Sequence, residues 1–175
     1  MSDRAHTQQA LNAAMSEAVE YARNLAPLSR PVLFALVPTV VLAGSLQRSL
    51  DDESAPLTLV VQDELPEELV SGSDELAAYI ASTQWPDAVE GVILAQEIRF
   101  RDPSSTPVDD GAARPALLVS GVLRAGPETT LLSIPQDNGA DELRGGDAVA
   151  PAVISALRYS LGRFDGHATT PPAAF

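Results

Sequence analysis

The side chains of this sequence best suited to chemistry are carboxylates, because the usual nucleophiles and bases are scarce. The chain contains no cysteine and no lysine, and its eleven basic residues are all arginines. Thiolate nucleophiles, Schiff bases and a lysine-containing phosphate loop are therefore excluded. Histidine occurs only as His6 and His167, in terminal segments that we expect to be mobile and therefore unsuited to hold a general base. We assign no catalytic, cofactor-binding or metal-binding residue from the sequence.

The densest group of carboxylates lies in the later part of the first half of the chain. Between Asp51 and Glu75 there are nine acidic residues and no arginine. Four of the nine fall in the segment DELPEE, at Asp63, Glu64, Glu67 and Glu68. These could hold a divalent cation weakly, form part of a surface for a basic partner, or simply keep the protein in solution. In a partner surface they would make association weaken as salt screens the charges.

The arginines at the predicted strand ends around the long polar loop are a second candidate for binding. Arg99, Arg101, Arg114 and Arg124 are expected to gather at neighbouring strand ends. There they could bind a carboxylate or phosphate, or pair with nearby acidic side chains. The predicted partner surface combines residues of both groups: Asp63, Glu64, Glu67, Glu68, Arg99, Arg101 and Arg124.

The polar pair Gln96–Glu97 stands inside the most strand-like segment, WPDAVEGVILAQEIRF. Apolar residues occupy both alternating faces of its first half, which is typical of a central strand covered on both sides. The predicted faces are Val89, Gly91, Ile93 and Ala95 on one side, and Val92, Leu94, Ile98 and Phe100 on the other. Since buried polar groups need partners, we favour a structural role for the pair over a polar site at the strand end.

The elements that must position these residues follow from periodicity, caps and breakers. Predicted helices cover Thr7–Ala26, Val40–Leu50, Asp74–Ser82 (capped by Ser73) and a last segment from the cap Asp147 to Leu161. Predicted strands cover Val32–Val37, Leu57–Gln62, Ala88–Phe100, Arg114–Ala125 and Thr129–Ile134, and polar loops cover Arg101–Ala113 and Pro135–Gly146. Trp85, followed by Pro86, is expected to be buried where the central helix leads into the third strand.

This order of elements indicates an α+β fold. We expect an antiparallel sheet of about five strands packed against the N-terminal, central and C-terminal helices. The expected organisation is a single domain over residues 1–165 with a C-terminal tail over 166–175. The element order is similar to the secretion-chaperone-like fold, whose members are often small acidic dimers that hold a partner chain. That similarity implies a possible homodimer.

Net charge limits the partners and the compartment. The formal charge is −13 at pH 7, which disfavours nucleic acid and anionic membrane surfaces. The N-terminal residues show no signal-peptide pattern, and the apolar run Val32–Gly44 is interrupted by Pro38 and too short to span a bilayer. We therefore expect a cytoplasmic protein.

Five segments carry a resemblance to a known family: PVLFALVPT, APLTLVVQDELP, QWPDAVEGVILAQEIRF, LLVSGVLRAG and GGDAVAPAVISAL. Their order, from Arg30 to Leu161, resembles an uncharacterised family of small acidic cytoplasmic proteins from Actinobacteria. The segments QDELP, WP and SGVLR are the most specific. The resemblance implies a lineage and a compartment, and it transfers no activity, cofactor or catalytic residue.

The leading hypothesis for function is a non-enzymatic protein-binding or chaperone-like module. The alternative is a small hydrolytic enzyme that depends on carboxylates or on a cation, and a third possibility is mimicry of nucleic acid by the acidic surface. A cleft holding two or more facing carboxylates would favour the enzyme, because catalysis needs convergent groups.

The lack of thiols and of clustered histidines leads to a first prediction. Neither EDTA nor a reductant should lower the melting temperature, because no disulfide and no thiolate or imidazole metal site contributes to folding. Differential scanning calorimetry with and without each reagent tests this. A decrease of more than roughly a few degrees in EDTA would reveal a structural carboxylate site.

Overall fold

The structure is a computed structural model of the whole chain. It describes residues 5–46, 55–62, 65–100, 114–136, 139–145 and 150–162, and every structural statement below refers to these ranges.

The described residues form one antiparallel sheet of six strands. In sequence order the strands are β1 (Val32–Pro38), β2 (Leu57–Gln62), β3 (Gly91–Phe100), β4 (Arg114–Leu123), β5 (Glu128–Pro135) and β6 (Asp141–Gly145). Their order across the sheet is β2-β1-β3-β4-β5-β6, and all neighbouring pairs run antiparallel. The predicted α+β class and the antiparallel sheet are confirmed.

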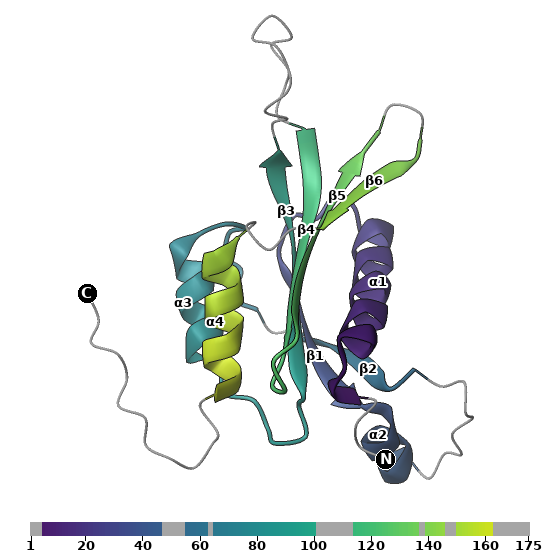
Figure 1. Cartoon of the computed structure of the whole chain (residues 1–175). Helices are drawn as coiled ribbons and strands as arrows, with labels where there is room; N and C mark the ends of the chain where they lie inside the picture. Colours follow the sequence, from purple (N-terminus) through teal and green to yellow (C-terminus); the bar gives the residue numbers. More distant parts are fainter. Residues whose placement is uncertain are drawn as a thin grey trace, which may run out of the picture.

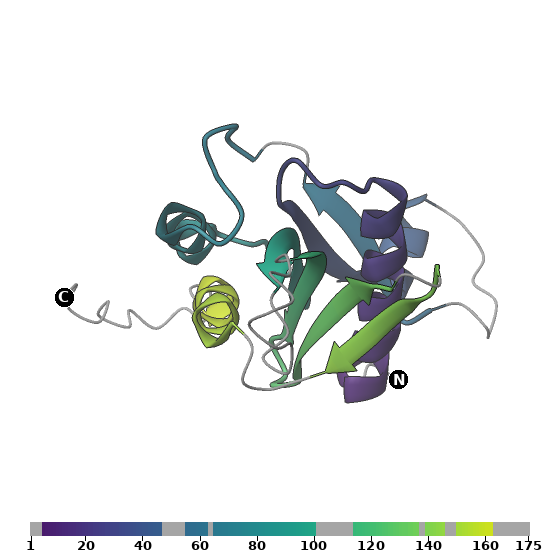
Figure 2. The same cartoon turned by 90° about the horizontal axis from the view of Figure 1, so that it is seen from above.

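Helices cover both faces of this sheet. They are α1 (Gln8–Asn24), α2 (Thr39–Leu46), α3 (Asp74–Ser82) and α4 (Pro151–Gly162). Figure 1 shows α1 alone on one face and the pair α3–α4 on the other, and Figure 2 shows the same three layers from above. The three helices with apolar stripes are thus the three that were predicted to pack on the sheet.

Local sequence signals explain where the helices begin. The side chain of Thr7 accepts a hydrogen bond from the amide of Ala10, and the side chain of Ser73 accepts one from the amide of Leu76. Each bond satisfies an amide that has no partner within its own helix. Pro151 is the first residue of α4, where its missing N–H costs nothing.

Each face of the sheet has its own apolar core. On the α1 side, seven small or flexible residues of the helix are buried against the sheet: Ala10, Leu11, Ala14, Met15, Ala18, Val19 and Ala22. Helix and sheet approach closely at Gly121, where an added Cβ would lie 2.6 Å from the sulfur of Met15. On the other side, α3 and α4 bury Leu76, Ile80, Leu157 and Leu161. Side chains at alternate positions of β3 therefore pack into two different cores, as the sequence pattern predicts.

Trp85 is buried at the point where α3 leads toward β3, as expected. Its side chain is 4% exposed, and its indole N–H donates to the hydroxyl of Ser160 in α4 over 3.1 Å. Ser160 in turn donates to the carbonyl of Leu157. The indole therefore joins the loop after α3 to the last turns of α4.

Two expectations about the strands need correction. The segment Pro135–Gly146 was expected to be a loop, but residues 141–145 form β6, which pairs with β5. The sequence of this strand shows no apolar alternation. It can form without one because backbone hydrogen bonds to a neighbouring strand are enough to hold an end strand. Val89 was placed on the same face as Ile93, yet it packs on the α3–α4 side, because it precedes the regular strand and does not follow its alternation.

The burial of Trp85 gives a prediction for stability. Trp85→Ala should lower the free energy of unfolding by about 3–5 kcal/mol, the usual cost of removing a buried large aromatic. Trp85→Phe retains much of the apolar contact and removes the N–H donor, so it should cost less. Urea denaturation of both variants provides the comparison. A Trp85→Ala protein as stable as wild type would contradict a core role.

Candidate functional site

The polar pair that stands out in the sequence has a structural explanation. Gln96 is 1% exposed and faces the α3 side, where its side-chain oxygen accepts the amide of Gly72 over 2.8 Å. Glu97 faces the α1 side, and its carboxylate accepts the amide of Leu28 over 3.1 Å. Adjacent residues of β3 therefore anchor a loop on each face of the sheet, which supports the structural role favoured for both.

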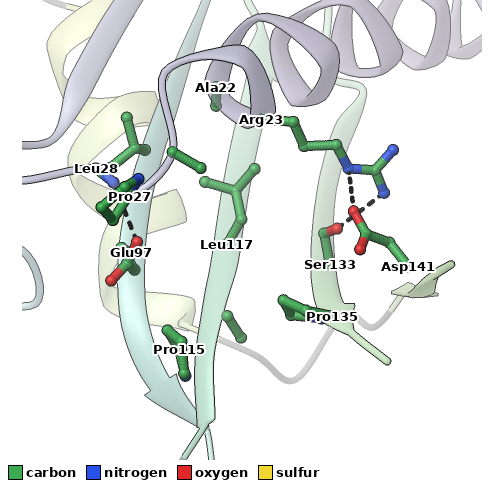
Figure 3. Close-up of a pocket in the computed structure, with 12 residues that line it drawn as sticks. Ala22, Arg23, Pro27, Leu28, Glu97, Pro115, Leu117, Ser133, Pro135 and Asp141 are labelled. Carbon is green, nitrogen blue, oxygen red and sulfur yellow. Dashed lines mark hydrogen bonds and ion pairs between the residues drawn. The ribbon is translucent and has the colours of Figure 1, made fainter. Parts of the chain in front are cut away.

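A concave feature of the described residues lies beside Glu97, where α1 ends and the strands continue. We call it the trough (Figure 3), and its volume is about 420 Å³. Twelve residues line it: Ala22, Arg23, Ala26, Pro27, Leu28, Glu97, Pro115, Ala116, Leu117, Ser133, Pro135 and Asp141. Most of these side chains are apolar, and they come from the end of α1, the following loop and the four strands β3 to β6.

The sheet register sets the floor of the trough. Glu97 pairs with Leu117, and Leu117 pairs with Ser133, so the three residues form one row across β3, β4 and β5. Pro115 and Pro135 flank this row further along their strands. Their rings have fixed shapes, so this floor loses little conformational freedom when something binds to it.

A charged pair closes the β6 end of the trough. The Nε of Arg23 lies 2.7 Å from Oδ2 of Asp141, and a second nitrogen of the same guanidinium donates to Ser133 over 2.9 Å. Arg23 is the basic residue in the last turn of α1, where a cation interacts favourably with the helix dipole. The ion pair therefore links the end of α1 to β5 and β6.

The two carboxylates of the trough do not face each other. Leu117 on β4 and Ser133 on β5 stand between Glu97 on β3 and Asp141 on β6 (Figure 3). Each carboxylate already binds a protein donor, the amide of Leu28 or the guanidinium of Arg23. The described ranges also contain no group of three or more acidic or histidine side chains that could hold a metal ion. This arrangement suits an apolar ligand better than bond cleavage.

The structure brings few of the predicted surface residues together. Glu67 and Glu68 are exposed between β2 and α3, and Glu67 pairs with Arg30 over 3.1 Å. Arg99 pairs in register with Pro115, so it lies next to the trough. Asp63, Glu64 and Arg101 lie outside the described residues.

Arg124 does not lie with Arg99 and Arg114 as the sequence suggested. Arg114 is the first residue of β4 and Arg124 comes directly after its last residue, so the whole length of the strand separates them. The guanidinium of Arg124 donates to the carbonyl oxygens of Val89, Leu161 and Pro86, and it thereby fixes the end of α4 beside the loop that precedes β3. These contacts are structural.

Sequence reasoning missed most of the trough. Its residues are scattered between positions 22 and 141, and no motif contains them. One signal was present: the prolines at 115 and 135 fall at the ends of two predicted strands. Proline at a strand end marks a place where ladder pairing stops and where backbone is open to other contacts.

The fold and the trough define an α+β protein with a sheet covered on both faces and an apolar recess at one end. Within the described part of the chain, no helix combines the length and the apolar character needed to cross a membrane. The chain belongs to the family of PPA1309-like proteins, which it matches over residues 11–162. This match agrees with the expected resemblance to an uncharacterised family, while the actinobacterial lineage and the cytoplasmic location stay predictions. No curated protein and no solved structure matches the chain.

The bond between Glu97 and Leu28 can be tested by paired substitutions. Glu97→Ala removes the acceptor and should lower the free energy of unfolding by about 1–2 kcal/mol, because the amide of Leu28 loses its partner. Glu97→Gln keeps an acceptor oxygen and should cost less than ~1 kcal/mol. Chemical denaturation of both variants measures the difference. Equal stability of the Ala and Gln variants would show that the bond does not hold the loop.

Proposed function

We propose that this protein is a non-enzymatic, cytoplasmic module that binds a short apolar segment of another protein in the trough. The observation that carries the proposal is a concave, mostly apolar recess whose carboxylates already bind protein donors. A recess of about 420 Å³ falls within the range of ligand pockets and has room for a few side chains of a bound segment.

The apolar lining supplies the affinity in this proposal. Apolar surface removed from water contributes roughly 25 cal/mol per Å², so even a small buried segment gains several kcal/mol before ordering costs. The lining consists largely of Ala, Pro and Leu side chains, which have few rotamers to lose. A site of this composition is prepared for binding without rearrangement.

The charged groups at the ends of the trough supply orientation. Glu97 keeps acceptor capacity beyond its one bond to Leu28, because a carboxylate has about four acceptor positions. The Arg23–Asp141 pair is partly exposed, with 38% and 29% of the side chains accessible. Partly exposed charges at a rim contribute to specificity and association rate more than to affinity. A segment with a donor at its Glu97 end fits best.

A cytoplasmic location is supported by composition. The chain has no cysteine, so nothing in it depends on an oxidising compartment. Its charge of −13 favours solubility and disfavours contact with anionic surfaces.

A matched pair of Ala→Trp substitutions tests the proposed function. Ala26 lines the trough and is exposed, whereas Ala13 is exposed on α1 and does not line it. Ala26→Trp should fill the recess and abolish partner recovery, and Ala13→Trp should leave recovery unchanged. Affinity purification from the native host, quantified by mass spectrometry, compares the two variants with wild type. Thermal unfolding of each variant verifies that the fold is retained.

Two results would contradict the proposal. The first is recovery of the same partners by Ala26→Trp and wild type, which would place binding elsewhere. The second is hydrolysis of a substrate by the purified protein that Glu97→Gln abolishes, which would make the trough an active site.

A further inference from the structure

The two end strands of the sheet differ in a way that points to a second interaction surface. The strand β6 has five residues, DELRG, of which three are charged. The strand β2 has six residues, LTLVVQ, and carries no charge and no proline. Charged side chains, prolines and short length are the usual means by which an end strand avoids pairing with other chains. By these criteria β6 is protected and β2 is open to pairing.

The side chains of β2 leave apolar surface on both of its faces. Leu59 and Val61 pack only partly against the core beneath α1. On the opposite face, Val60 is 37% exposed, since α3 and α4 pack over β1, β3 and β4 rather than over β2. An added strand with alternating apolar residues would therefore find apolar neighbours above and below the sheet.

The backbone of β2 has a defined set of outward groups. At the start of the β1–β2 ladder the amide of Thr39 donates to the carbonyl of Pro56 over 3.0 Å. Because hydrogen-bonding directions alternate along an antiparallel strand, Thr58 and Val60 bond toward β1. The N–H and C=O groups of Leu57, Leu59 and Val61 therefore point away from β1.

We propose that β2 accepts an extended segment of a partner protein as an additional strand, and that this segment carries basic residues on both sides of its apolar core. The added strand would bond to the outward groups of Leu57, Leu59 and Val61. This surface is separate from the trough, on which the proposed function rests, so each can fail without the other.

Charge determines which occupant fits. In the sequence, β2 is preceded by Asp51, Asp52 and Glu53 and followed by Asp63 and Glu64. A second copy of the chain has the same net charge of −13, so long-range repulsion opposes pairing of β2 with itself. A segment with basic ends is instead attracted by the net charge of the chain. The charge pattern therefore selects a basic partner over self-pairing.

Synthetic peptides provide the direct test. The probe is the peptide RRTVTVTVRR with a fluorescent label, and binding to the full chain is measured by anisotropy. We compare it with EETVTVTVEE, which inverts the flanking charge, and with RRTVTVTVRR that is N-methylated at every residue of the central TVTVTV, which removes the N–H donors of both strand edges but keeps charge and side chains. Both comparison peptides should bind at least about tenfold more weakly, and affinity of the first should fall between ~50 and ~300 mM salt.

Protein variants locate the site. Val60→Lys places a positive charge on β2, and Val70→Lys places the same charge at a residue that is 65% exposed in the loop before α3. Val60→Lys should weaken binding of RRTVTVTVRR about tenfold, and Val70→Lys should have little effect. Ala26→Trp, which fills the trough, should leave this peptide's affinity unchanged.

Three outcomes would overturn the proposal. Equal binding of the N-methylated and unmodified peptides would show attraction by charge without strand addition. Equal weakening by Val60→Lys and Val70→Lys would show that β2 is not the site. A dimer of wild type in analytical ultracentrifugation that Val60→Lys dissociates would identify a second copy as the occupant of β2.

Discussion

The structure depends on a strand that is buried on both faces. Six consecutive residues of β3, from Gly91 to Gln96, are buried, because α1 covers one side and α3 with α4 the other. Neither face of such a strand is exposed to solvent, so a contrast between a polar and an apolar face cannot set its register. Packing against both apolar cores fixes its position instead. The stretch of β3 that is buried on both faces ends at Gln96 and Glu97. Each satisfies a loop amide, and together they tie the loops of both helical layers to one point of the sheet.

Helix length and strand length are unequal on the α1 side, and the difference makes the trough. The helix ends at Asn24, while β3 and β4 continue past the row of Glu97 and Leu117. The loop through Pro27 and Leu28 forms a wall of the trough beyond the end of α1. Without this wall, the floor residues in that region would be exposed to solvent. On the opposite face, one small cluster of buried residues continues further along β4 and β5 and includes Leu118 and Leu132. The recess is thus confined to one face.

Most elements, the antiparallel sheet and its three covering helices were predictable from the sequence, whereas β6 and the trough were not. The cap Ser73 and the proline at Pro86 indicate where α3 begins and ends, and the β-branched residues of β2 indicate a strand. The strand β6 was missed because DELRG contains no apolar alternation, and its strand state comes from the backbone of β5. The trough was missed because its residues meet only through register. Contacts between distant segments leave no periodic trace in sequence.

The trough has a thermodynamic consequence, because no single segment of the chain contains it. Its walls lie between Ala22 and Asp141, so the unfolded chain offers no comparable surface. A ligand of this recess therefore binds the native state alone, and it shifts the folding equilibrium by about 2.7 kcal/mol when its free concentration is a hundred times its dissociation constant. Occupancy and resistance to unfolding are then coupled quantities. In a cell, the supply of the proposed partner would then help to determine how much of this chain escapes proteolysis.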